Sequence, residues 1–194
     1  MSGSSPFPSP VQEIELRLPG SHTTQEFGAA LAGCLRPGDL ITLTGDLGAG
    51  KTTFTQGLGR GLAVRDGIIS PTFVLARMHP SCGDGPGLVH VDAYRLQSRA
   101  EFLGLDLEAY VSTSVTVVEW GRGMAEGLVG FPEDPLASWL DVTLVRPVGG
   151  EHRVTSRIIT DFSDEDGEGG DEIRSAVVRA YGPRWVGIDL SVVR

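Results

Sequence analysis

Residues Gly45 to Thr52 read Gly-Asp-Leu-Gly-Ala-Gly-Lys-Thr and match the spacing G-x-x-x-x-G-K-[ST]. In such a loop, successive backbone N–H groups turn inward and hold the phosphate oxygens of a nucleotide. The ammonium of Lys51, the only lysine of the chain, would reach the β- and γ-phosphates, and the Thr52 hydroxyl would face Mg²⁺. The alternative is a purely structural glycine turn. The motif predicts nucleotide contacts from Gly45, Asp46, Gly48, Ala49, Gly50, Lys51, Thr52 and Thr53.

Two carboxylates follow apolar, β-branched runs that are typical of buried strands. Asp92 ends the run Leu-Val-His-Val, and Glu119 ends the run Val-Thr-Val-Val. In open α/β sheets, ligands bind beyond the carboxyl ends of the strands, so both acids are expected at the nucleotide. One could hold the metal and the other could orient the attacking water, and the residues alone do not say which. Alternatively, either acid pairs with an arginine such as Arg95 or Arg122.

Four further side chains near these motifs are candidates for the site. Ser70 and Thr72, on either side of Pro71, stand where nucleotide-sensing switch segments occur, although an ordinary proline turn is equally consistent. Arg95 could neutralise charge in the transition state or pair with the preceding acid. Trp120 could form a wall of the site or contact a partner. By contrast, we expect mid-strand His90 only to be packed.

Periodicity predicts the elements that must position these residues. We expect strands at 14–18, 39–44, 73–79, 88–91, 115–118, 139–145 and 154–160, and helices that begin at the T-x-x-E pattern of 23–26 and span 51–61 and 172–181. Strands alternate with helices over the first 130 residues or so. This alternation predicts an α/β fold of three layers, with a largely parallel central sheet and added antiparallel strands.

Composition bounds the domain organisation and the class of partner. We predict a disordered tail at 1–10, one domain at 11–160, and an acidic extension at 161–194 whose deletion leaves activity intact. The net charge is −9, and seven acids at 161–172 leave −2 for the remainder, so no basic face for direct nucleic-acid binding is expected. The chain has no asparagine, which excludes an N-K-x-D guanine motif and a protein-kinase catalytic loop.

Cellular location is predicted from what the sequence lacks. The first residues have no basic or apolar signal segment, and no apolar run reaches the length of a membrane span. The 2 cysteines form no C-x-x-C pair, which favours a reducing compartment. We therefore expect a cytoplasmic protein with no membrane contact.

Four sequence blocks together resemble the TsaE (YjeE) family. They are GDLGAGKTT at 45–53, SPTF at 70–73, HVDAYR at 90–95 and VEW at 118–120, in this order. TsaE is the P-loop ATPase of bacterial tRNA threonylcarbamoyladenosine biosynthesis, and the resemblance runs from about residue 19 to 145. It implies a P-loop NTPase fold and Mg²⁺-dependent hydrolysis of ATP.

The resemblance also implies roles and partners. Thr52 and Glu119 would hold Mg²⁺, Asp92 would be needed for activity alongside Lys51, and Thr24 would lie near the nucleotide. The protein, a monomer when alone, would bind a TsaB–TsaD complex that installs threonylcarbamoyl on the adenosine beside the anticodon. ATP hydrolysis would reset that complex between turnovers, and tRNA would be contacted only through these partners.

Two other functions remain open at this point. A small-molecule P-loop kinase would need an acceptor pocket and an arginine-bearing lid, for which the stretch 95–118 is short. A nucleotide-gated binding module would need nucleotide binding but not hydrolysis. Product analysis with candidate acceptors tests the first, and a variant that binds without hydrolysing tests the second.

Overall fold

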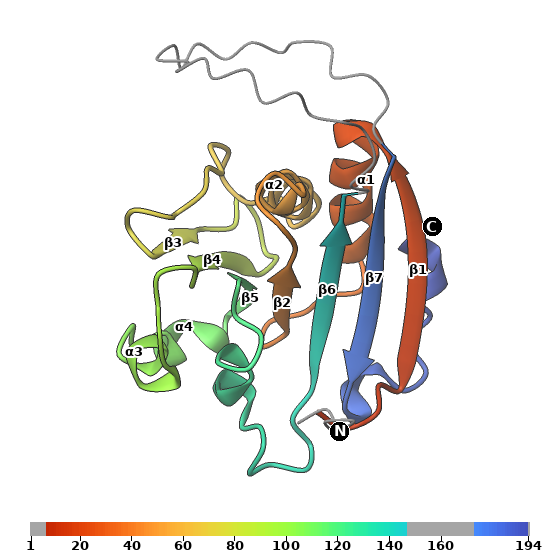
Figure 1. Cartoon of the computed structure of the whole chain (residues 1–194). Coiled ribbons are helices and arrows are strands. Elements are labelled where there is room, and N and C mark those ends of the chain that lie inside the picture. Colours follow the sequence, from red (N-terminus) through yellow and green to blue (C-terminus); the bar gives the residue numbers. More distant parts are fainter. Residues whose placement is uncertain (1–6, 147–172, 194) are drawn as a thin grey trace, which may run out of the picture.

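A computed structural model describes residues 7–146 and 173–193, which form one seven-stranded sheet in the order β1-β7-β6-β2-β5-β4-β3 (Figure 1). The described elements are β1 Gln12–Pro19, α1 Gly20–Ala32, β2 Leu40–Thr44, α2 Lys51–Gly61, β3 Ala76–His79, β4 Gly87–Asp92, α3 Arg99–Leu103, α4 Glu108–Val111, β5 Ser114–Glu119, η1 Ala125–Val129, β6 Trp139–Val145, β7 Ile173–Tyr181, η2 Pro183–Trp185 and η3 Leu190–Val193.

The centre of the sheet is parallel. β6, β2, β5 and β4 run in one direction, while β7 and β3 pair antiparallel at the two sides of this group. β1 lies at the edge, antiparallel to β7 and therefore in the direction of the central strands. All the carboxyl ends of the central strands consequently meet at one edge, where the loop between β2 and α2 also lies (Figure 1).

Helices cover both faces of the sheet. On one face, α1 and α2 bury Phe27, Leu31, Phe54 and Leu58 in the larger core. On the other face, Phe102, Leu107 and Ala125 pack in a second core with the sheet. The predicted three-layer α/β arrangement is confirmed, and it is a P-loop NTPase fold. None of the described helices is long and apolar enough to cross a membrane.

The helix predicted over 172–181 is wrong, because Ile173–Tyr181 is the strand β7. Ala176, Val178 and Ala180 are fully buried at every second position, which is the period of a strand. Pairing with β1 on one side and β6 on the other satisfies the backbone of this segment along most of its length. The local sequence of this segment also suits an amphipathic helix, and pairing with the distant strands β1 and β6 makes it a strand instead.

The predicted division at residue 160 is also wrong for the described part of the C-terminal segment. β7 is inserted between β1 and β6, and Trp185, Leu190 and Val193 are buried in the larger core. Residues 161–172, with their seven acids, lie outside the described residues, as does the strand predicted at 154–160. The antiparallel partner of β6 is β7 rather than 154–160.

The ends of three other predicted elements differ from the structure. Residues 1–6 lie outside the described part, whereas Phe7 packs its ring 5.7 Å from Phe131 and 5.9 Å from Trp139, so the predicted disordered tail does not extend to it. α1 begins at Gly20 rather than at Thr23. β3 spans only Ala76–His79, because the preceding chain turns back onto the Pro71 carbonyl and Leu75 has a φ of 66°.

Candidate functional site

The glycine loop connects β2 to α2 and leaves the start of the helix open to a ligand. Gly50 precedes the helix with a φ of 100°, a left-handed conformation that glycine adopts without steric cost. No described side chain caps α2 and its first turn carries no acid. The N–H groups at the start of a helix have no intrahelical acceptor, and the helix dipole favours an anion there. The loop is therefore built to receive a negatively charged group.

Lys51 lies over this loop, with 6% of its surface exposed. Its Nζ donates to the carbonyl oxygens of Gly45 at 2.9 Å and Asp46 at 3.0 Å, and it lies 4.2 Å from the centroid of the Trp120 ring. Burial lowers the pKa of Lys51, and the carboxylates of Glu119, Asp92 and Asp46 oppose this shift. The phosphate oxygens of a bound nucleotide would add to these carboxylates in favouring the charged form of Lys51.

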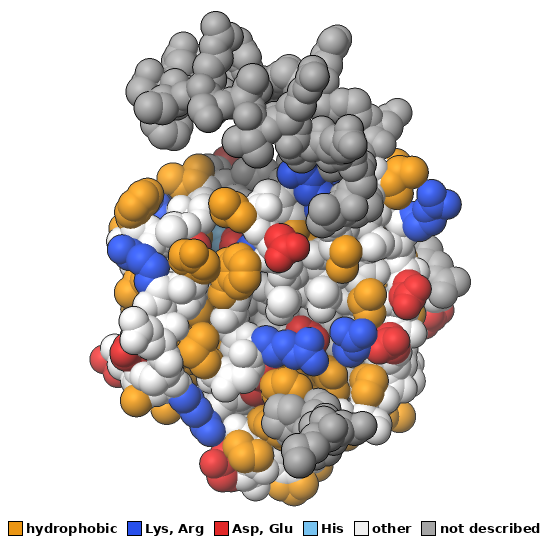
Figure 2. All heavy atoms as spheres, in the orientation of Figure 1, with side chains coloured by type: hydrophobic (Ala, Val, Ile, Leu, Met, Phe, Trp, Pro, Cys, Tyr) orange, Lys and Arg blue, Asp and Glu red, His pale blue; other side chains and the backbone are white. Residues whose placement is uncertain are grey.

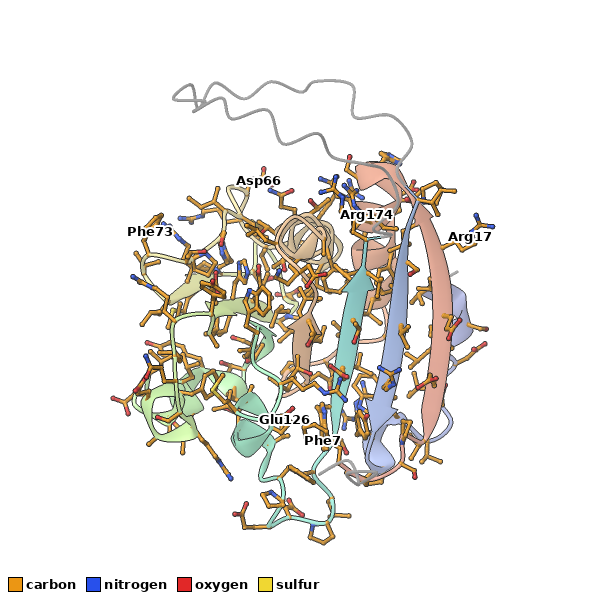
Figure 3. All side chains as sticks on the ribbon, viewed as in Figure 1. Phe7, Arg17, Asp66, Phe73, Glu126 and Arg174 are labelled. Atoms are coloured by element: carbon orange, nitrogen blue, oxygen red, sulfur yellow. The ribbon has the colours of Figure 1, made fainter. Side chains whose placement is uncertain are left out.

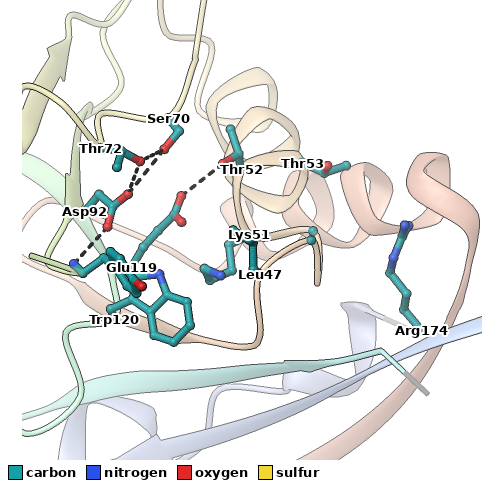
Figure 4. A pocket seen from close by; sticks show the side chains of 13 residues that line it. Leu47, Lys51, Thr52, Thr53, Ser70, Thr72, Asp92, Glu119, Trp120 and Arg174 are labelled. Carbon is teal, nitrogen blue, oxygen red and sulfur yellow. Dashed lines mark hydrogen bonds between the residues drawn. The ribbon is translucent and has the colours of Figure 1, made fainter. Parts of the chain in front are cut away.

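The strand register brings the two predicted carboxylates together. Asp92 and Glu119 are partners across the parallel pair β4–β5, each the last residue of its strand. Only 4% of Asp92 and 3% of Glu119 is exposed. The Thr52 hydroxyl donates to Oε1 of Glu119 at 3.3 Å, which joins the carboxylate to the first turn of α2 (Figure 4).

His90 also contacts Glu119, a role that the sequence analysis did not assign. Its Nε2 lies 2.8 Å from Glu119 Oε1, and the imidazole is fully buried. A carboxylate that holds a metal only accepts hydrogen bonds, so in that form of the site Nε2–H would be the donor in this pair. Its Nδ1 has no partner among the described atoms. His90 precedes Asp92 by two residues, so alternation along β4 places both side chains on one face, a signal available from the sequence.

The second carboxylate holds the candidate switch segment. Asp92 Oδ2 accepts from the hydroxyls of Thr72 at 2.5 Å and Ser70 at 3.4 Å, and these two hydroxyls lie 2.7 Å apart. Asp92 Oδ1 accepts from the N–H of Tyr94 at 3.0 Å. Arg95 instead donates to the Phe73 carbonyl at 3.2 Å, so the alternative pairing of Asp92 with Arg95 is not observed among the described contacts.

Trp120 projects over the loop because of an unusual backbone conformation. Its φ is 61°, in the left-handed region that non-glycine residues rarely adopt and that costs about 1–3 kcal/mol. Its backbone N–H donates to the Leu43 carbonyl at 3.0 Å, and the centroid of its ring lies 5.4 Å from that of Tyr94. This turn after β5 directs the indole toward Lys51 instead of into the core.

These groups surround one cavity of about 570 Å³ (Figure 4). Its lining residues are Leu47, Gly48, Gly50, Lys51, Thr52, Thr53, Ser70, Thr72, Asp92, Tyr94, Glu119, Trp120 and Arg174. The structure thus brings ten of the residues singled out from the sequence to one site and adds Leu47, Tyr94 and Arg174. The candidates that do not line it are Thr24, Gly45, Asp46, Ala49 and Arg95.

Thr24 lies behind the loop rather than in the cavity. It is fully buried, its hydroxyl donates to the Gly20 carbonyl at 3.2 Å, and a Cβ placed on Gly50 would lie 3.6 Å from its Cγ2. Thr24 therefore limits how far Gly50 can move. Arg174 was missed because the helix predicted over its segment gave no reason to place it at the nucleotide edge.

The donor set fits a magnesium–nucleotide ligand. Uncapped N–H groups and an ammonium suit phosphate oxygens, and Mg²⁺ prefers hard oxygen ligands such as the Thr52 hydroxyl and the Glu119 carboxylate. A P-loop site holds its metal by few protein ligands, with the phosphates supplying the others. Asp92 lines the same cavity and accepts hydrogen bonds from Ser70 and Thr72.

Comparison with known proteins identifies the family. Residues 18–146 match the model of "Threonylcarbamoyl adenosine biosynthesis protein TsaE". The chain is 48% identical over 170 residues to the tRNA threonylcarbamoyladenosine biosynthesis protein TsaE of Streptomyces coelicolor, covering 87% of this chain and 98% of that protein. The Bacillus subtilis protein of the same name is 38% identical over 119 residues, covering 61% and 73%.

A solved structure agrees with these sequence matches. The crystal structure of Bacillus subtilis YdiB superposes with a TM-score of 0.60 at 27% identity, covering 90% of each chain. These matches agree with the glycine loop, the paired carboxylates and the three-layer fold described above. The chain belongs to the TsaE family, whose members are named for tRNA threonylcarbamoyladenosine biosynthesis.

Proposed function

We propose that the protein hydrolyses ATP with Mg²⁺ in the cytoplasm and thereby drives tRNA threonylcarbamoyladenosine formation by a TsaB–TsaD-like complex. The observation that carries the proposal is the single cavity in which Lys51, Thr52, Asp92 and Glu119 meet. In this proposal Lys51 binds the β- and γ-phosphates. Thr52 and Glu119 hold the metal, which when bound neutralises charge on the phosphates. Asp92 orients the attacking water and reports the state of the nucleotide to Ser70 and Thr72.

Exposed apolar side chains support action through protein partners: Leu47 and Tyr94 line the cavity, and Phe73 follows the lining residue Thr72. Leu47 is 92% exposed, Phe73 88% and Tyr94 66%. Figure 2 shows hydrophobic side chains gathered at the upper left of the molecule, on the side where Figure 3 labels Phe73. Large exposed apolar groups that cluster mark interaction sites. A partner docked there would sense the nucleotide, and the net charge of −9 favours contact with tRNA through such partners.

Glu119→Gln tests this function, because it keeps the shape of the side chain and removes the charge that the metal needs. We expect at least about a hundredfold loss of ATP hydrolysis, the scale seen when one preorganised electrostatic group is removed. ATP binding, measured by calorimetry, should survive. Reconstituted tRNA modification with TsaB and TsaD should fail, whereas these partners should still be retained in a pull-down with ATP.

Glu108→Gln is the matched control, since Glu108 is an exposed residue of α4 outside the cavity. It should match the wild type in hydrolysis and modification. Full modification by Glu119→Gln despite lost hydrolysis would instead support the nucleotide-gated binding module. Wild-type protein that neither hydrolyses ATP nor binds TsaB–TsaD with any nucleotide would overturn the proposal.

His90→Leu is expected to weaken the metal site without removing a metal ligand. The substitution deletes the donor that fixes Glu119 Oε1, and loss of such a supporting contact typically costs about 10–100-fold in metal affinity or activity. We expect the Mg²⁺ concentration for half-maximal hydrolysis to rise by about that factor. The measurement is the ATPase rate as a function of Mg²⁺ at saturating ATP.

His79→Leu controls for the removal of a buried imidazole. His79 lies on β3, and burial lowers its pKa, so at neutral pH it is uncharged and its loss removes no charge from the site. Its Mg²⁺ dependence should equal that of the wild type. Equal dependence in both variants would assign His90 to packing alone.

A further inference from the structure

Arg174 lies in a part of the chain that the family model does not match, which ends at residue 146. It is the second residue of β7, and β7 runs antiparallel to β6, so its first residues lie at the edge where the central strands end. Arg174 pairs with Leu18 of β1 in register. Leu18 and Ala176 are buried in the core beneath α1 and α2, so Arg174 faces the same side (Figure 3).

The guanidinium of Arg174 stands against the phosphate loop and has no anionic partner among residues 7–146 and 173–193. A Cβ placed on Gly50 would lie 3.9 Å from Arg174 Cδ. Arg174 Nε is buried and has no hydrogen-bond partner among the described residues. By contrast, Arg179 of the same strand binds Glu13 at 2.6 Å. A partly buried cation that lacks a partner is costly unless a ligand supplies one, so this group indicates an anion site.

The position of Arg174 specifies which part of a nucleotide it would meet. Thr52, Glu119 and Asp92 occupy one end of the cavity, where the metal and the β- and γ-phosphates belong. Thr53 and Arg174 line the other side of the loop (Figure 4). The α-phosphate and the nucleoside therefore have to extend away from the carboxylates, toward Thr53 and Arg174.

We propose that Arg174 is a nucleotide-binding residue that pairs with the α-phosphate of ATP and of ADP. The inference rests on the proposed nucleotide function of the cavity and adds to it a binding residue from β7. A guanidinium presents planar N–H donors that suit a phosphate, and such charge-assisted bonds are roughly twice as strong as neutral ones. Because both nucleotides carry the α-phosphate, Arg174 holds substrate and product equally and does not discriminate between them.

The test is calorimetric titration of full-length Arg174→Gln and Arg174→Ala with ATP and with ADP, both in the presence of Mg²⁺. Each variant should lose about tenfold to a hundredfold in affinity, which is the loss expected for one hydrogen bond to a charged group. The factor should be the same for both nucleotides. Thermal melting without nucleotide should occur at or above the wild-type temperature, since the substitution removes a partly buried cation that has no partner among the described residues.

Arg17→Gln is the matched control, because Arg17 is an exposed arginine of neighbouring β1 that points away from the site (Figure 3). It removes the same charge and should leave both affinities unchanged. Wild-type affinity in both Arg174 variants would overturn the inference while leaving the proposed function intact. A loss confined to ATP would place the guanidinium at the γ-phosphate and overturn the assignment. Failure of the wild type to bind either nucleotide would overturn both proposals.

Discussion

A chain that ends at Thr160 is expected not to fold, contrary to the expectation from composition that residues after this point are dispensable. The truncation removes β7, so β1 and β6 lose their shared partner. It also removes Val178, Trp185 and Leu190 from the core. Each such side chain contributes about 1.5–3 kcal/mol by burial, against a total stability of about 5–15 kcal/mol for a typical domain. Circular dichroism should show no cooperative thermal transition, and ATP hydrolysis should be absent.

Two substitutions in the full-length chain test whether the burial of β7 itself is needed for stability, without the additional effects of truncating the chain. Ala176→Asp places a carboxylate at a fully buried position of β7, and Ser175→Asp places one at the adjacent position, which is not fully buried. The first should be strongly destabilised, by more than about 3 kcal/mol, because a buried charge has no partner there. The second should change stability far less. A truncated chain that melts cooperatively and hydrolyses ATP would show that β7 is an appendage after all.

Lys51→Ala is expected to abolish ATP turnover and to lower ATP affinity strongly. Lys51 supplies the ammonium at the centre of the loop, where its Nζ donates to two backbone carbonyls and lies beneath Trp120. Removing it leaves the β- and γ-phosphates without the ammonium of the loop, in a buried setting where charges interact more strongly than in water. We expect at least about a hundredfold loss of affinity, given that charged contacts of this kind contribute about 1.5–3 kcal/mol each. Calorimetry and a phosphate-release assay give the two measurements.

Arg60→Ala provides the control on the same helix, since Arg60 is exposed in the last turn of α2 and does not line the cavity. Both variants lose one positive charge, yet only Lys51→Ala should impair the nucleotide site. Lys51→Arg should also fail, because the planar guanidinium does not replace a compact ammonium in a tight loop. Unchanged ATP affinity in Lys51→Ala would contradict the placement of the nucleotide in this loop.

The sequence predicted most of what lies close together along the chain. β2, the glycine loop and α2 follow one another without interruption, so the spacing of Gly45, Gly50 and Lys51 predicts their arrangement before any tertiary contact is known. Asp92 and Glu119 were predicted as the ends of their strands for the same reason, and both are. The central strands were predicted from short apolar runs that no other element type suits as well.

Prediction failed where the outcome depended on a distant partner. The segment Ile173–Tyr181 suits a helix or a strand locally, and only the unfilled position between β1 and β6 makes it a strand. His90 was expected merely to be packed, because the residues around it in the sequence do not show that the Glu119 side chain of the next strand reaches its imidazole. Arg174 could not be placed at the loop until the strand that carries it was placed in the sheet.

By itself, then, the order of amino acids determined the kinds of chemistry this protein contains: a phosphate-binding loop, an ammonium, a hydroxyl and two acids at strand ends. Tertiary structure alone decided which atoms meet, namely Glu119 with His90 and Thr52, Asp92 with Thr72, and Arg174 with the loop. The reason is that a loop's conformation follows from neighbouring residues, whereas strand order and register follow from the burial of whole faces against elements far away in the chain.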